Sequence, residues 1–305
     1  AHNLKVGGSN PSPATKIHMN SLRFPHPSKK DETFIFKNEK FENQTNDKEK
    51  IKVLKYSENK DGWNEDLTKI KDHHISNNHP IDIASIEMCL SLLENYEKSE
   101  KKIILEIGCL NGKLAKKIID SKKYNYIGSD AISSNVVKLA EDYKNTPFVV
   151  FDILENPFKK SICNTLIMLN VLEHIEDDVK ALDEAYKMLD ENGLLIIEVP
   201  AGKFLYDNYD KQLLHFRRYS LSEISNKLLK SGFKIEKKTH LGFSIFPFFV
   251  LIKIFNKFFK KNNIVVQQTK ITDNFLVKFL FYLDKKLKNF NLPFGIRCVI
   301  CARKK

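Results

Sequence analysis

Several features are scarce in this sequence, and each scarcity excludes a class of protein. The 305 residues include only five cysteines, spread singly apart from Cys298 and Cys301, so no disulfide framework is expected and a reducing compartment suits the chain. No stretch of about 18 uncharged apolar residues occurs, which argues against an ordinary membrane span. Apolar and charged residues are as frequent as in globular proteins, which excludes wholesale disorder. We therefore expect a cytoplasmic protein with room for one large α/β domain and extensions.

The first 80 residues predict little regular structure. Residues 1–18 contain neither the basic nor the apolar segment of a signal peptide. The codons for Gly8-Ser9-Asn10-Pro11 can spell the T-arm of a transfer-RNA gene, so we expect residues 1–18 to be foreign to a native chain that starts at Met19. The remainder, up to residue 80, is rich in Lys, Asn and Glu and predicts a flexible polar region with short elements.

From residue 81 onwards, short apolar runs alternate with apolar residues at helical spacing. Buried-strand patterns occupy the segments 103–107, 124–129, 148–151, 165–169, 194–199, 233–240 and 295–302. Strands that alternate with helices predict an α/β fold, a doubly wound and mostly parallel seven-stranded sheet with helices on both faces. We assign residues 81–240 to this domain, residues 241–294 to a helical insert, and residues 295–305 to the last strand.

Glycines and acids follow the ends of the first three strands. Gly108 and Gly112 join the first strand to a helix, where glycine permits a tight turn and a close approach of a ligand. The N–H groups at the start of that helix favour an anionic or carboxylate group. Asp130 ends the second strand about 20 residues later, where an acid accepts hydrogen bonds from a ribose. Asp152 ends the third strand, so all these groups belong to one edge of the sheet.

Two segments of the domain resemble motifs of the class I S-adenosylmethionine-dependent methyltransferases. Residues 106–112 resemble their first motif, an acid, any residue and then Gly-x-Gly-x-Gly, although Leu110 replaces the middle glycine and can crowd the cofactor or alter the loop path. Residues 169–175, Leu-Asn-Val-Leu-Glu-His-Ile, resemble the fourth motif, near the transferable methyl group. The resemblance covers residues 80–240 and the last strand, and it implies a Rossmann-like fold that binds S-adenosylmethionine. The residues implied in cofactor binding are Glu106, Gly108, Cys109, Gly112, Asp130, Ala131, Asp152, Ile153, Asn170 and Val171.

The resemblance also implies what some of these residues do. Gly108 and Gly112 would flank the methionine moiety, and Glu106 would orient the loop and the amino group. Asp130 would hold both ribose hydroxyls. Asp152 would accept a hydrogen bond from the adenine amine.

A second cluster, residues 214–220, reads Leu-His-Phe-Arg-Arg-Tyr-Ser. It resembles an element of methyltransferases grouped with ubiquinone-type and cell-envelope glycan-modifying enzymes, which implies that Arg217, Arg218 and Tyr219 bind the acceptor. Paired arginines there can bind a carboxylate or phosphate. The alternative is a loop pinned by Arg–Asp pairs, for instance to Asp207 or Asp210.

The candidate catalytic residues are His174 and His215. His174 can act as a general base for a hydroxyl acceptor, or it can shape the pocket from a second layer. We expect no metal, because His73, His74 and His79 fit no standard zinc spacing and no cysteine is near.

The C-terminal third is strongly basic. Residues 203–305 contain 22 Lys and Arg against 6 Asp and Glu, which predicts an anionic partner. In the segment 248–261 lysines line one face of a helix and phenylalanines occupy the rest, which is typical of an interfacial membrane helix. We therefore expect a possible anionic membrane surface as partner, with the protein peripheral on the inner face of the membrane. A lid or a dimer interface is the alternative, and the oligomeric state is unknown.

These patterns together predict methylation, at oxygen, of a small-molecule or lipid- or glycan-linked acceptor whose identity the sequence does not reveal. The basic third also fits an RNA methyltransferase. Nucleic acid is the less expected partner, because the Asn/Asp-Pro-Pro-aromatic element of amino-methylating enzymes is absent. A non-catalytic cofactor-binding scaffold is the third alternative, suggested by Leu110.

Overall fold

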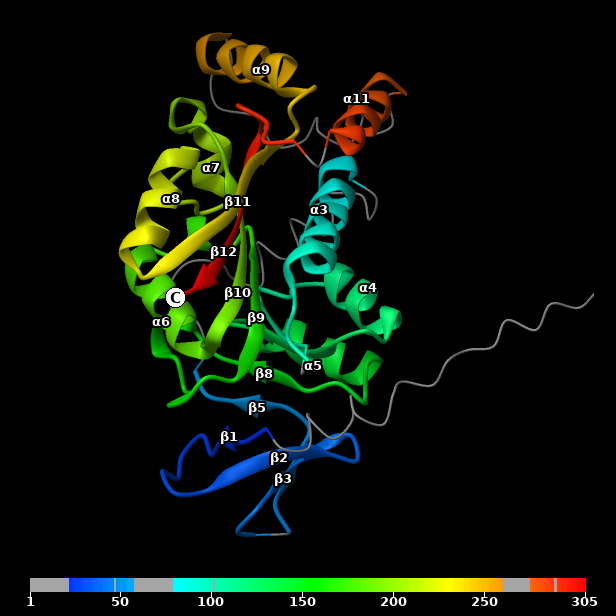
Figure 1. Ribbon diagram of the computed structural model, residues 1–305, viewed down its shortest axis with the longest axis vertical. Helices are drawn as coiled ribbons and strands as arrows, with labels where there is room; N and C mark the ends of the chain where they lie inside the picture. The colour runs from blue at the N-terminus through cyan, green and yellow to red at the C-terminus, as the bar shows by residue number, and fades with distance from the viewer. Residues whose placement is uncertain (1–21, 47, 58–78, 101, 260–274, 288–289) are drawn as a thin grey trace, which may run out of the picture.

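The computed structural model describes residues 22–46, 48–57, 79–100, 102–259, 275–287 and 290–305 (Figure 1). The expectations for residues 1–18, for Met19, for His73 and His74, and for the side chains of residues 255–261 lie outside the described part. The strands are β1 (Phe24–Pro25), β2 (Thr33–Lys37), β3 (Lys40–Asn43), β4 (Lys50–Ile51), β5 (Leu54–Lys55), β6 (Ile103–Ile107), β7 (Asn125–Asp130), β8 (Phe148–Val150), β9 (Cys163–Leu169), β10 (Leu189–Pro200), β11 (Phe233–Leu241) and β12 (Arg297–Lys304). The helices are α3 (Pro80–Tyr96), α4 (Lys113–Ser121), α5 (Ser133–Asp142), α6 (Asp178–Met188), α7 (Asn208–Gln212), α8 (Leu221–Lys230), α9 (Phe246–Phe259) and α11 (Phe275–Lys286), with short 3-10 turns η1 (Ile153–Glu155), η2 (Leu172–His174) and η3 (Lys203–Leu205).

The main sheet has eight strands in the order β11-β12-β10-β9-β6-β7-β8-β5. Strand β12 runs antiparallel to both β10 and β11, while the pairs from β10 across to β5 are parallel. Side chains along β6 and β7 are buried on both faces, because α6 and α8 cover one face and α3, α4 and α5 cover the other (Figure 1). The predicted fold and its seven strands are confirmed, and β5 is an addition that the sequence patterns missed.

The strand order reverses beside β6, which places a ligand crevice at the strand ends. The chain moves outward from β6 through β7 to β8, and then returns to β9 on the opposite side of β6. In open α/β sheets of this kind the connections leave the switch point in opposite directions and open a crevice at the carboxyl ends of the strands. The loops after β6, β7, β8 and β9 all start from this edge.

Residues 22–57 form a small sheet, so the prediction that they are flexible is wrong. Strands β1 to β4 form an antiparallel sheet of their own at the end of the molecule where β5 lies (Figure 1). Phe24, Phe34 and Phe41 are fully buried, and the ring of Phe24 meets the ring of Phe158 edge-on at 6.4 Å between centroids. The few apolar residues of this polar region are therefore sufficient to attach it to the main core.

The insert carries α9 and α11, which lie together at the end of the molecule opposite β1 to β3 (Figure 1). Helix α9 packs against η3, and α11 packs against α3. Both helices stand near the carboxyl ends of β10 and β11, because β11 leads directly into the insert. Among the helices that the structure describes, none has the length and apolar character needed to cross a membrane.

Candidate functional site

The loops after β6 and β9 approach each other closely. A Cβ atom on Gly108 would lie 2.5 Å from Cγ2 of Val171, so a side chain at this position would force one of the two loops to move. Gly108 has a φ of 79° and Gly112 a φ of 73°, which are conformations that favour glycine. These two glycines permit the tight turn and the close packing of Val171 and Leu139 against it.

Leu110 retains the left-handed conformation that a glycine would take, with a φ of 43°. Its backbone N–H donates to Oδ2 of Asp130 at 3.0 Å, and the N–H of Ile132 donates to Oδ1 at 2.9 Å. One buried carboxylate at the end of β7 thus secures the turn after β6 and the turn after its own strand. The carboxylate offsets the strain of a leucine at positive φ, so the loop follows a glycine-like path.

Glu106 is the penultimate residue of β6, just before the turn that Gly108 begins. Its side chain is buried and accepts a hydrogen bond from the hydroxyl of Tyr126. Burial raises the pKa of Glu106 to about 8, against a smaller lowering by the Tyr126 hydrogen bond. The site therefore holds an acid that is protonated at neutral pH and that a nearby cation would ionise.

This raised pKa makes stability depend on pH. In the unfolded chain Glu106 loses its proton near the ordinary glutamate pKa of 4.5, but in the folded chain only near 8, so stability falls as pH rises between these values. We expect Glu106→Gln to remove this loss and to raise the free energy of unfolding, relative to the wild type, by about 2 kcal/mol more at pH 7.5 than at pH 5.5. Urea unfolding at both pH values measures the difference. An equal effect at both pH values would show that Glu106 is ionised in the folded protein.

At the end of β8, Asp152 and Ile153 begin the turn η1. The carboxylate of Asp152 accepts from the N–H of Leu154 at 2.9 Å, and the hydroxyl of Ser57 accepts from the N–H of Asp152 at 2.8 Å. Ala131 follows Asp130 in the neighbouring loop, and Cys109 is buried beside Gly108. The predicted cofactor residues therefore share one edge, and the N-terminal segment reaches that edge through Ser57, which the sequence did not suggest.

A polar network at the ends of β9, β10 and β12 was also missed. The buried carboxylate of Glu198 accepts from Asn170 Nδ2 at 3.0 Å, from Ser85 Oγ at 2.8 Å and from the Arg297 guanidinium at 2.5 Å. Arg297 and Lys113 each lie 3.5 Å from Asp82 at the start of α3. Asn170, a predicted cofactor residue, thus supports this network with its side chain.

The two predicted catalytic histidines meet at this edge although 41 positions separate them in the sequence. Their rings make an edge-on contact with centroids 4.6 Å apart. The Nδ1 atom of His215 lies 2.9 Å from Oδ1 of Asp210, a carboxylate with no exposed surface. Burial alone would raise the pKa of Asp210, but hydrogen bonds from His215 and Arg218 hold it well below its usual value. An ionised Asp210 accepts a hydrogen bond from Nδ1–H of His215, which leaves the lone pair on Nε2 to act as a base.

Glu173, His174 and His215 could also hold a metal ion. One ligand atom from each of these side chains lies within 4.8 Å of the others, and Asp210 orients His215 as a carboxylate commonly orients a metal-bound imidazole. The expectation that the site has no metal stays a prediction.

The structure does not support acceptor binding by Arg218 and Tyr219. Arg218 is 6% exposed and donates to Asp210 at 2.8 Å and to the carbonyl of Ala201 at 3.2 Å. Tyr219 is fully buried and donates to Asp178 at 2.8 Å. Arg217 is more accessible, but its guanidinium contacts Asp178 at 2.9 Å. The alternative of a loop pinned by Arg–Asp pairs describes this segment, because ion pairs and burial use the donors that an acceptor would need.

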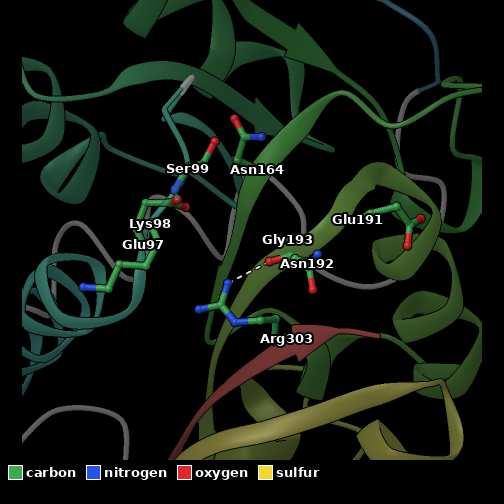
Figure 2. A pocket seen from close by; sticks show the side chains of 8 residues that line it. All are labelled: Glu97, Lys98, Ser99, Asn164, Glu191, Asn192, Gly193 and Arg303. Atoms are coloured by element: carbon green, nitrogen blue, oxygen red, sulfur yellow. Dashed lines mark hydrogen bonds between the residues drawn. The ribbon is translucent and has the colours of Figure 1, made fainter.

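A hollow of about 260 Å³ lies at the opposite end of the strands from these residues, where β9 begins (Figure 2). It is lined by the end of α3, the start of β9 and the 191–193 turn, together with Arg303. Arg303 donates to the carbonyls of Asn192 and Tyr96, both at 2.7 Å. This hollow contains none of the predicted site residues and lies away from the strand ends where they gather.

Comparisons with known proteins agree with the fold described above. A methyltransferase domain family matches residues 82–238, just over half of the chain. A curated protein of Mycolicibacterium smegmatis, named as a probable S-adenosylmethionine-dependent methyltransferase, is 24% identical over 135 residues, which are 44% of this chain and 52% of that protein. The chain therefore spans about half the length of this relative.

Two solved structures are similar in fold. A protein of Galdieria sulphuraria, named as a sarcosine dimethylglycine methyltransferase, has a TM-score of 0.53 at 13% identity, with 79% of this chain and 99% of that one covered. A phosphoethanolamine N-methyltransferase 2 of Haemonchus contortus, solved with phosphomonomethylethanolamine and S-adenosylhomocysteine, has a TM-score of 0.50 at 15% identity, with 78% and 60% covered.

Proposed function

The chain belongs to the class I S-adenosylmethionine-dependent methyltransferases, and on that premise we propose that it methylates an oxygen atom of a small-molecule or lipid- or glycan-linked acceptor. The observation that carries the proposal is the buried Asp210–His215 pair, which places a base beside His174 at the strand ends. Transfer to a hydroxyl requires removal of a proton, and a positioned imidazole can take it.

The proposed cofactor residues fit S-adenosylmethionine. Gly108 permits the tight turn beside which the methionine moiety would lie, and Glu106 lies in β6 just before this turn, where it could ionise beside an amino group. Asp130 would accept from the ribose hydroxyls and Asp152 from the adenine amine. Cys109, Gly112, Ala131, Ile153 and Val171 would line the same edge.

We expect Asp130→Ala to weaken the binding of S-adenosylhomocysteine by about 1.5–3 kcal/mol, or roughly 10- to 150-fold in Kd, because buried hydroxyls would lose a charged acceptor. Titration calorimetry measures the change. The matched control is Asp177→Ala, which also removes a carboxylate that accepts from a backbone N–H but lies at the start of α6. A Kd within about twofold of the wild type would remove Asp130 from the site.

Methyl transfer requires mainly that the protein align the methyl donor with the acceptor. When bound, the cofactor supplies a methyl group on a sulfonium sulfur, and transfer to an acceptor oxygen leaves that sulfur neutral. The chain's part is to hold the acceptor in line and to accept its proton at Nε2 of His215. Asp210 stabilises the imidazolium that results. The His215 side chain is 10% exposed and Asp210 has no exposed surface, so this ion pair would form largely out of contact with bulk water.

The acceptor class is tested by incubating the full chain and methyl-labelled cofactor with lipid, glycan-nucleotide and RNA extracts. The proposal predicts label in the lipid or glycan fraction, and mass spectrometry of the product should place the methyl group on oxygen. Label confined to RNA, or a methyl group on nitrogen, would contradict it.

A further inference from the structure

We propose that α9 and α11 together form a docking surface for an anionic lipid membrane, at the end of the molecule where the strand ends open. The surface is defined here by the exposed apolar side chains of α9 and α11, and is called the docking surface below.

Helix α9 presents four of its described apolar side chains outward. Those of Phe248, Leu251, Ile252 and Ile254 are 49%, 65%, 47% and 45% exposed. Lys253, in contrast, is 8% exposed and points into the protein. This is the reverse of a helix on the surface of a globular protein, which turns its apolar face to the core. Lys253 of the predicted lysine face is therefore turned toward the protein and is not available to a membrane.

Two acidic residues beneath α9 account for its orientation. The Lys253 ammonium lies 2.7 Å from Asp207 and 3.4 Å from Asp210, the two acids that form the capping box of α7. Asp210 is buried and Asp207 is 19% exposed. Lys253 adds a second cation to Arg218 beside these acids, which favours the face that α9 turns inward. Within the part of the chain that the structure describes, the apolar residues on the other face remain about half exposed.

Helix α11 adds exposed aromatic and basic residues at the same end of the molecule (Figure 1). Phe279 and Tyr282 are 45% and 54% exposed, and exposed lysines stand at 278, 285 and 286. Lys286 lies over the ring of Tyr282, 5.4 Å from its centroid. Aromatic side chains interleaved with lysines suit the boundary between acyl chains and head groups.

The positive charge of the docking surface favours an anionic membrane over a second copy of the chain. The exposed charged residues described at the surface include the lysines at 278, 285 and 286, of which Lys285 pairs with Glu87, so two copies facing each other would oppose like charges. Anionic head groups would instead attract each nearby lysine. With 14 residues, α9 is about 21 Å long, which suits a helix lying in the interface better than one crossing the bilayer.

Docking would bring the catalytic edge to the membrane. Asp210 bonds both Lys253 of α9 and His215, so the helix that meets lipid is one contact away from the proposed base. Delivery of a lipid-linked acceptor along this surface rests on the proposed function, whereas docking itself does not.

Sedimentation of the full chain with vesicles tests the proposal. We expect binding at low salt to vesicles of phosphatidylcholine and phosphatidylglycerol, weaker binding as salt rises, and little binding to phosphatidylcholine alone. Phe248→Glu combined with Leu251→Glu should weaken binding by at least about tenfold, because two apolar side chains are replaced by charges. The matched control is Leu229→Glu, at the far end of α8, where the wild-type side chain is 49% exposed; it should bind as the wild type does.

Light scattering and titration with S-adenosylhomocysteine accompany the vesicle assay. The double variant should keep the cofactor affinity of the wild type, so a failure of docking is separate from a failure of the proposed function. Absence of sedimentation at low salt overturns the proposal. So does a wild-type dimer that the double substitution converts to a monomer, because a second copy would then cover the surface.

Discussion

His215→Asn should lower kcat by about 100- to 10 000-fold while changing the affinity for S-adenosylhomocysteine by less than about twofold. Asparagine can still donate to Asp210, whose buried carboxylate would otherwise lose one partner, but it provides no base for the acceptor proton. Initial rates over a range of acceptor concentrations separate kcat from KM. Raising the pH should restore part of the lost rate, because a larger fraction of the acceptor ionises without help.

Two controls define what the result means. His174→Asn should have a smaller effect if His174 only supports the ring of His215, which it contacts edge-on. If a chelator removes wild-type activity and a divalent ion restores it, the cluster of Glu173, His174 and His215 holds a metal and the base assignment fails. An unchanged kcat in His215→Asn would also refute the assignment.

Arg218→Ala should destabilise the fold by about 3–5 kcal/mol, because it breaks a buried ion pair and leaves Asp210 with only His215 and Lys253 as side-chain partners. Arg218 and Asp210 are 6% and 0% exposed, and the Arg218 guanidinium also bonds the carbonyl of Ala201. The midpoint of urea unfolding measures the loss. The control Arg217→Ala should cost about 1 kcal/mol or less, since Arg217 is 26% exposed and Asp178 keeps Lys227 and Tyr219.

The opposite pattern would support the prediction from sequence that Arg218 binds the acceptor. If Arg218→Ala unfolds at the wild-type urea concentration but raises KM for the acceptor, the arginine binds substrate, and Asp210 must be satisfied by His215 and Lys253 alone.

The strand ends could be predicted because local patterns determine them. Continuous apolar runs identified β6, β7 and β9 as buried strands, and the residue after each run belongs to the same edge of a parallel sheet. The positions of Asp130 and Asn170 follow from this periodicity. Which side chains meet across the edge depends on tertiary packing, so the partnership of Glu198 with Arg297, 99 residues apart, had no local signal.

The N-terminal sheet was missed for a different reason. Its strands are two to five residues long, and polar residues dominate the composition around them. A signal was present in Thr33–Lys37, where Phe34 and Phe36 alternate with partly or fully exposed residues as in a half-buried strand. The polar composition of the region predicted flexibility in spite of this alternation. Three fully buried phenylalanines are nonetheless enough to hold the sheet on the main core.

The orientation of α9 shows what periodicity cannot decide. Helical spacing separates lysines from phenylalanines in this segment, but it does not say which face meets the protein. The default is that the apolar face turns inward. Here Asp207 and Asp210 lie beneath the helix and Lys253 pairs with them, so the default fails at that position.

The most direct test of the central claim is a single turnover with methyl-labelled S-adenosylmethionine at one molecule per chain. Mixed with the lipid or glycan fraction that gave a labelled product, the wild type should convert the cofactor to S-adenosylhomocysteine and form methylated acceptor in equal amount. Asp130→Ala should reduce both products together at the same concentrations. Tight cofactor binding with no transfer to any fraction would contradict the account and leave a cofactor-binding scaffold.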